Sequence, residues 1–136
     1  MITGLIPGAM KPYHAGHHFL TEMALRECDR VVIFTNVKNR GPIHGMDMYD
    51  IWKNIIEPLL DPRVTVSFVG SPVTAVYDIL EQEQIRPTDI EYKLYGGTED
   101  LARFASDYIK RKFPNVADRF TNVAESSSGQ YLRGVG

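Results

Sequence analysis

Two histidines, a lysine and several glycines stand close together near the start of the chain, in the stretch GAMKPYHAGH from Gly8 to His17. Imidazole and ammonium groups donate hydrogen bonds to oxyanions, and glycine lets a ligand come close to the backbone. His14 and His17 are three residues apart, which puts two side chains on the same side of a helical turn. Together with the full positive charge of Lys11, this pattern predicts a binding site for an anionic group such as a phosphate.

The stretch lies where a predicted strand is followed by a predicted helix. The apolar run Ile2–Pro7 is typical of a strand, and the amphipathic run 16–27 is typical of a helix. A helix that begins near Ala15 would have His14 just before it and His17 in its first turn. The unpaired N–H groups and partial positive charge of a helix N-terminus favour anions. The elements around the stretch therefore favour the same kind of ligand as its side chains.

The rest of the chain alternates between short apolar or β-branched runs and longer amphipathic runs. The further strands are predicted at Arg30–Thr35, 63–69, 91–95 and 119–123, and the further helices at 47–60, 73–83 and 98–113. This alternation predicts right-handed βαβ crossovers and a parallel sheet. We expect a single domain, 1–136, with an α/β fold: a Rossmann-like, doubly wound, five-stranded parallel sheet with helices on both faces. In such sheets ligands bind at the carboxyl ends of the strands, where the direction of winding reverses.

The composition of the 136 residues argues against some classes of protein. The apolar fraction of 43% and the charged fraction of 24% are ordinary for a soluble globular protein. A net charge of −2 without a basic block argues against broad binding to nucleic acid, and no apolar run approaches the ~18 residues of a membrane span. Cys28 is the single cysteine, so no intramolecular disulfide can form, and we expect it to fill the core. Since a signal-peptide pattern is also lacking, we expect a cytoplasmic protein.

The stretch 8–17 resembles a known signature. It is similar to the pattern G-x-[FM]-x-P-x-H-x-G-H of the nucleotidyltransferase superfamily with the HIGH-type motif, which includes cytidylyltransferases, adenylyltransferases and the catalytic domains of class I aminoacyl-tRNA synthetases. Members carry a second signature near the C-terminus, I-S-[STG]-T-x-x-R. The segment 127–133, SSGQYLR, is similar to it, with Ser127 in place of the apolar residue and Gln130 in place of threonine. The resemblance covers both ends of the chain and agrees with the expected five-stranded fold.

This resemblance implies a reaction in which a phosphate oxygen of an acceptor attacks the α-phosphate of a nucleoside triphosphate and releases pyrophosphate. Nucleotidyl transfer needs positioning and neutralisation of phosphate charge more than a covalent group on the protein. In the implied mechanism His14 and His17 stabilise α- and β-phosphate oxygens in the transition state, and Lys11 neutralises the reacting phosphates. Mg²⁺ would bridge oxygens of the triphosphate, and we expect no metal site made by the protein alone.

Further nucleotide contacts are implied at both ends of the chain. Ser128 and the N–H of Gly129 would hold the β- and γ-phosphates, and Arg133 would bind the leaving pyrophosphate. A glycine-containing turn after the fourth strand would lie near the base and the ribose. The implied nucleotide-binding residues are Gly8, Ala9, Met10, Gly16, Gly96, Gly97, Ser128, Gly129, Gln130 and Arg133.

Two basic residues and two further histidines are tied less closely to the motif. Lys38 and Arg40 follow the second predicted strand, so we expect them at the same edge of the sheet, where they would bind an acceptor phosphate. Basic residues are also common in loops that bind no ligand. His18 and His44 match no motif position. A metal site built from the histidines is an open alternative, because H-x-x-H spacings occur in such sites, but no acidic or cysteine partner is evident.

Two functions are open on this evidence. The first is an enzyme that transfers a nucleotidyl group from CTP or ATP to a small phosphorylated acceptor. The second is a non-catalytic nucleotide-binding module, which the replacement of threonine by Gln130 favours. The sequence does not decide between the two bases. Superfamily members are often dimers or larger assemblies, so a homo-oligomer is also open.

Overall fold

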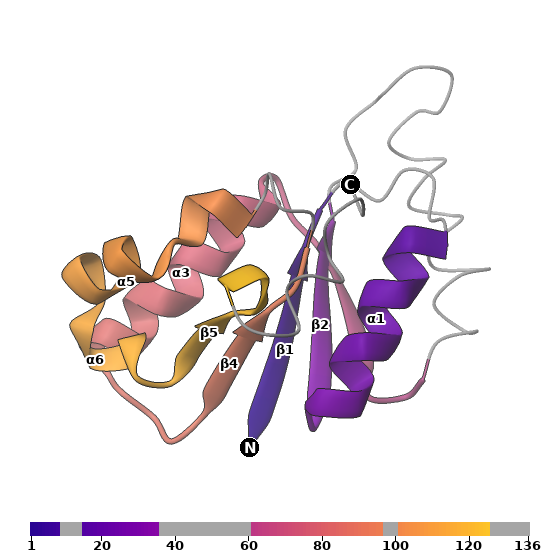
Figure 1. The fold of residues 1–136 in the computed structure, drawn as a ribbon, viewed down its shortest axis with the longest axis horizontal. Coiled ribbons are helices and arrows are strands. Elements are labelled where there is room, and N and C mark those ends of the chain that lie inside the picture. Colours follow the sequence, from indigo (N-terminus) through magenta and orange to yellow (C-terminus); the bar gives the residue numbers. More distant parts are fainter. Residues whose placement is uncertain (9–14, 36–60, 97–100, 126–136) are drawn as a thin grey trace.

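Five strands form one fully parallel sheet in the computed structural model of the chain (Figure 1). The structure describes residues 1–8, 15–35, 61–96 and 101–125. The strands are β1 (Ile2–Pro7), β2 (Arg30–Thr35), β3 (Val64–Phe68), β4 (Glu91–Leu94) and β5 (Phe120–Asn122). They lie in the order β3-β2-β1-β4-β5, so the predicted Rossmann-like α/β fold is confirmed.

The order of the strands puts the reversal of winding between β1 and β4. From β1 the chain moves outward through β2 to β3, then returns to β4 on the other side of β1 and ends the sheet at β5. Leu5 in β1 pairs with Val32 of β2 on one side and with Leu94 of β4 on the other. The carboxyl ends of β1 and β4 therefore form the switch point, which is where folds of this kind bind their ligands.

Helices cover both faces of the sheet, as predicted. The helices of the described residues are α1 (Ala15–Glu27), α3 (Pro72–Ile85), α5 (Ser106–Lys112) and α6 (Pro114–Ala117), with two short 3-10 helices, η3 (Ala102–Phe104) and η4 (Val123–Glu125). Figure 1 shows α1 on one face of the sheet and α3, α5 and α6 on the other. None of the helices in the described part of the chain has the length and apolarity that crossing a membrane requires.

Gly4, in the middle of β1, lets α1 pack close to the sheet. A Cβ atom at this position would lie 3.1 Å from Cys28 Sγ, 3.3 Å from Ala24 Cβ and 3.4 Å from Tyr95 Cε2. These distances leave no free space for a side chain between the strand and the helix. Cys28 is only 6% exposed, which confirms the expectation that it fills the core.

The prediction of one continuous helix over 98–113 is wrong for the described residues from Leu101 onward. The chain forms η3, leaves the helical conformation at Ala105 (φ −57°, ψ 141°) and only then forms α5. Phe113 also leaves the α region (φ −131°, ψ 60°), as residues before a proline tend to do, and the unpredicted α6 starts at Pro114. The break at Ala105 has a tertiary cause, since one side chain of β5 and one of η4 bind the backbone on either side of it.

The other predicted elements agree with the structure wherever it describes them. β1 and β2 have the predicted bounds, and α3, β3, β4 and β5 begin and end within two residues of the prediction. Ser71 caps α3 by accepting a 3.3 Å hydrogen bond from the N–H of Thr74, and Pro72 occupies the first helical position. The predicted helix 47–60 and residues 98–100 lie outside the described residues.

Candidate functional site

Gly8 and Gly96 lie at the carboxyl ends of β1 and β4, on the two sides of the switch point. The N–H of Gly8 donates a 2.9 Å hydrogen bond to the carbonyl of Phe34, which keeps β1 paired with β2 to its end. The N–H of Tyr95 donates a 2.9 Å hydrogen bond to the carbonyl of Leu5, and Gly96 follows directly. Because the strands are parallel, the chain leaves the sheet at the same end after both glycines. We call this end, where the strands finish, the carboxyl edge. Two of the predicted nucleotide-binding residues thus belong to the edge where such folds bind ligands.

The helix after the first strand begins where the motif requires it. α1 starts at Ala15, so the backbone of Gly16 and His17 belongs to its first turn, and His14 is the residue directly before it in the sequence. Figure 1 shows this start at the end of the molecule where the strands finish. The first turn contains no acidic residue, so no carboxylate in that turn offsets the partial positive charge of the helix N-terminus.

His18, for which the motif offers no role, has a contact along its own helix. Its Nε2 lies 3.0 Å from Oε1 of Glu22, one turn further on, and both side chains are exposed. The side chain of His17 and most of the other predicted site residues lie outside what the structure describes. These residues are Ala9, Met10, Lys11, His14, Lys38, Arg40, Gly97, Ser128, Gly129, Gln130 and Arg133, and His44 also lies outside it.

One residue at the end of β5 and one in η4 bind the backbone that follows β4, and the sequence patterns did not single them out. Asn122 is 4% exposed, and its Nδ2 donates hydrogen bonds to the carbonyls of Leu101 (2.8 Å) and Phe104 (3.1 Å). The carboxylate of Glu125 accepts hydrogen bonds from the N–H of Ser106, at 3.2 and 3.3 Å, and from its hydroxyl. These contacts hold both sides of the break at Ala105 and connect the two last strands at their carboxyl ends.

Tyr95 anchors the end of β4 to the end of α1. Its side chain is fully buried, and its hydroxyl donates a 2.5 Å hydrogen bond to Oε1 of Glu27 and lies 3.5 Å from Sγ of Cys28. Burial, the thiol and the carboxylate together raise the pKa of Tyr95 far above its usual range. Burial also raises the pKa of Cys28. Both groups therefore stay protonated at neutral pH, and they position the backbone before Gly96 rather than take part in proton transfer.

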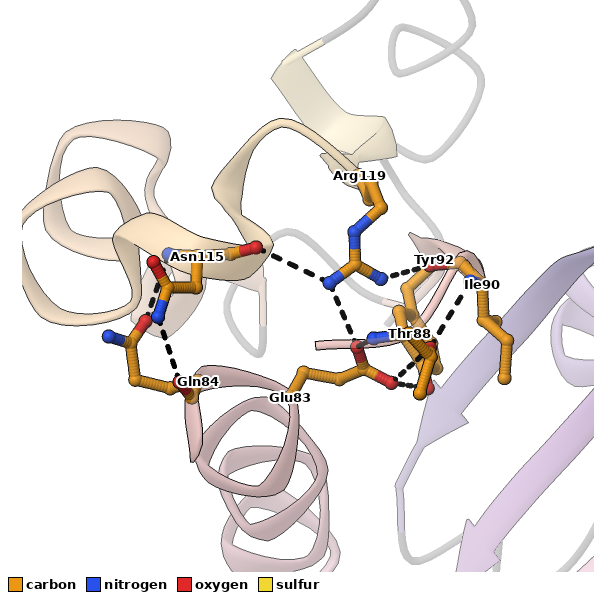
Figure 2. A network of polar contacts seen from close by, with 7 residues as sticks. All are labelled: Glu83, Gln84, Thr88, Ile90, Tyr92, Asn115 and Arg119. Carbon is orange, nitrogen blue, oxygen red and sulfur yellow. Dashed lines mark hydrogen bonds and ion pairs between the residues drawn. The ribbon is translucent and has the colours of Figure 1, made fainter. Parts of the chain in front are cut away.

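A polar network lies at the amino ends of the strands, where β4 and β5 begin (Figure 2). We call this end of the sheet the amino edge. At its centre is Glu83 of α3, which is only 4% exposed. Its carboxylate accepts hydrogen bonds from the N–H and hydroxyl of Thr88 (2.9 and 2.7 Å), the Tyr92 hydroxyl (2.9 Å) and Nη2 of Arg119 (2.8 Å). Burial opposes ionisation of Glu83, but these donors outweigh it and lower its pKa to about 2. Burial and the Glu83 carboxylate raise the pKa of Tyr92 to about 12.

The same network ties α3 to α6 and to the start of β5. Nη1 of Arg119 donates a 2.6 Å hydrogen bond to the carbonyl of Ile90, and Nη2 donates one of 3.3 Å to the carbonyl of Asn115. The N–H of Asn115 donates a hydrogen bond to Oε1 of Gln84, and Nδ2 of Asn115 donates one to the carbonyl of Gln84, both at 2.9 Å (Figure 2). The network is far from the switch point and its charges are paired within the chain, so we interpret it as structural.

The described ranges contain no group of three His, Cys, Asp or Glu side chains arranged to hold a metal ion. Comparison with known proteins found no family model and no curated protein that match the chain. The interpretation of the carboxyl edge therefore depends on the motif, on its position between β1 and α1, and on the switch point of the sheet.

Proposed function

We propose that the protein is a nucleotidyltransferase. It would transfer a nucleoside monophosphate from CTP or ATP to a small phosphorylated acceptor and release pyrophosphate. The observation that carries the proposal is the position in the chain of the stretch 8–17, which begins directly after β1 at the switch point and ends in the first turn of α1. A phosphate at this position would meet the N–H groups of a helix N-terminus whose first turn has no carboxylate.

The side chains of the stretch would supply the positive charge that the transition state needs. His14 and His17 would donate hydrogen bonds to oxygens of the α- and β-phosphates as the bond to the leaving pyrophosphate breaks. Lys11 would neutralise the charge that the attacking phosphate brings to the α-phosphate. No covalent intermediate on the protein is needed, because positioning and charge neutralisation account for most of the catalysis in this class of reaction.

The other contacts would hold the two substrates on either side of the reacting phosphorus. Gly96 and Gly97 follow β4 and would lie against the base and ribose, while Ser128 to Arg133 would hold the β- and γ-phosphates. Lys38 and Arg40 follow β2, the neighbour of β1, and would bind the acceptor phosphate. A Mg²⁺ ion arriving with the triphosphate would neutralise part of the charge on its oxygens.

Pyrophosphate release tests the proposal directly. The purified protein is incubated with CTP or ATP, Mg²⁺ and a panel of phosphomonoesters, and pyrophosphate is measured over time. We expect release that depends on one of the two triphosphates and on one class of acceptor. Nucleotide binding without release for any acceptor would favour the non-catalytic module that Gln130 points to. Neither binding nor release would overturn both functions.

A further inference from the structure

We propose that Asn122 and Glu125 are positioning residues for the nucleoside triphosphate, because they join the end of β5 and η4 to the backbone that follows β4. This inference rests on the proposed function. It concerns two residues outside both sequence signatures, and it predicts a kinetic effect that differs from that of the motif residues.

Asn122 makes the more buried of the two connections. It is the last residue of β5 and pairs in register with Leu94 of β4. Its Nδ2 bonds to the carbonyls of Leu101 and Phe104, and its Oδ1 accepts a 3.0 Å hydrogen bond from the N–H of Ala124. A buried amide that uses donor and acceptor in this way determines the local backbone geometry, because any displacement leaves buried polar groups unpaired.

Glu125, which is exposed, makes the second connection. Its carboxylate accepts hydrogen bonds from the N–H of Ser106, the first residue of α5, and from the Ser106 hydroxyl. Ala105 offers no capping side chain, so Glu125 supplies the cap for α5 from a distant part of the chain. The break at Ala105 is thus held from both sides by residues of β5 and η4.

Two groups of predicted nucleotide-binding residues lie close to these contacts in the sequence. Gly97 stands four residues before Leu101 in the sequence, and Ser128 stands three residues after Glu125. Both segments are therefore attached within a few residues of the Asn122 and Glu125 contacts. The reacting phosphates would instead meet the stretch that ends in His17, beside β1. Loosening the Asn122 and Glu125 contacts should therefore weaken triphosphate binding and leave the chemical step largely intact.

Steady-state kinetics of variants separate these effects. In Asn122→Ala and Glu125→Ala, we expect the KM for the triphosphate to rise by about tenfold and about fivefold, while kcat stays within about twofold of wild type. Glu125→Gln keeps an oxygen acceptor for Ser106 and should restore the KM to within about twofold. The matched control is Asn115→Ala, since Nδ2 of Asn115 also donates to a backbone carbonyl, that of Gln84, but at the opposite edge.

Each outcome has a definite meaning. An unchanged triphosphate KM in folded Glu125→Ala and Asn122→Ala, with an active wild type, would overturn the positioning role and leave the proposed function standing. An equal rise in KM in Asn115→Ala would also overturn it, because a general loss of stability would then be the cause. If Asn122→Ala fails to fold, Glu125→Ala decides alone, since Glu125 is exposed. A wild type that releases no pyrophosphate overturns the proposed function and this inference together.

Discussion

The two edges of the sheet use their polar groups differently. At the amino edge, the carboxylate of Glu83 is surrounded by donors from Thr88, Tyr92 and Arg119, all from the chain itself. At the carboxyl edge, β1 and β4 are followed by glycines, and α1 starts with a turn without acidic residues. A carboxylate bound by several donors has little capacity left for a ligand, whereas a helix N-terminus leaves backbone N–H groups for one and glycine lets a ligand come close to the backbone.

If the proposed function is correct, stability and ligand binding belong to opposite ends of the same strands. A substitution in the Glu83 network should change the free energy of unfolding and leave turnover alone, and a substitution in the stretch 8–17 should do the reverse.

Removing the charge of Glu83 should have the largest effect. In Glu83→Gln the guanidinium of Arg119 loses its 2.8 Å ion-pair partner in a largely buried setting, and breaking such a pair costs about 3–5 kcal/mol of unfolding free energy. Urea denaturation measures the loss, and kcat at a temperature where the variant is folded should equal that of wild type. The control is Glu81→Gln on the exposed side of the same helix, which should change stability by less than about 0.5 kcal/mol.

Replacing His17 should give the converse result. His17→Ala should lower kcat by about 10²–10³-fold, the scale of one lost transition-state donor, and leave the melting temperature nearly unchanged. His18→Ala is the neighbouring control: the contact of His18 with Glu22 is exposed, and the turnover of this variant should stay at the wild-type level. Turnover of His17→Ala close to that of wild type would remove this residue from the mechanism.

Acid should lower the free energy of unfolding in the pH range where Glu83 becomes protonated. Folding lowers the pKa of Glu83 to about 2 from its ordinary value of 4.5, so its ionised form stabilises the fold above about pH 4.5. This contribution, about 3 kcal/mol by linkage, is lost progressively as the pH falls from there toward 2. Unfolding free energies measured across this range in wild type and Glu83→Gln should converge as the pH falls. Parallel curves would show that Glu83 is not the group responsible.

Gly4→Ala should affect both ends of the strands to a smaller extent. The new methyl group would press on Cys28, Ala24 and Tyr95, and such overpacking costs about 1–3 kcal/mol. Because α1 carries His17 in its first turn, a displaced helix should also lower kcat several-fold. Gly70→Ala is the control, since a Cβ at that position meets nothing within 4 Å. A destabilised Gly4→Ala with full turnover would show that α1 can shift without moving the catalytic stretch.

The strands and α1 were predictable because their residues follow simple rules. β1 and β2 are continuous apolar or β-branched runs, and parallel strands covered on both faces require such runs. The break at Ala105 was not predictable, since the run 98–113 has helical periodicity and the interruption depends on Asn122 and Glu125, which are distant in the sequence. Side-chain contacts of this kind leave no trace in local periodicity.

Within the candidate site, the start of α1 was predictable, and the contacts made by Tyr95, Asn122 and Glu125 were not predicted. The start of α1 follows from the expected helix after the first strand, so the position of His17 in the first turn agrees with expectation. The burial of Tyr95 against α1 could have been predicted from the sequence. Neighbouring residues in an extended strand point to opposite faces, so Tyr95 points away from the face that Leu94 contacts and toward α1. Glu83 resembles an ordinary surface glutamate of an amphipathic helix, and only the fold shows that it is buried.

The order of the strands also bears on how the chain reaches its folded state. β2 pairs with both β1 and β3, and β4 pairs with β5. Each side of the sheet can therefore assemble through contacts between consecutive strands. The junction of β1 with β4 joins Ile2 to Glu91 and closes the longest loop of the sheet, a step whose entropy cost slows it relative to the local pairings. The switch point is created at that same junction. Recovery of activity during refolding should therefore report the last docking step, after most of the helical and strand structure has formed.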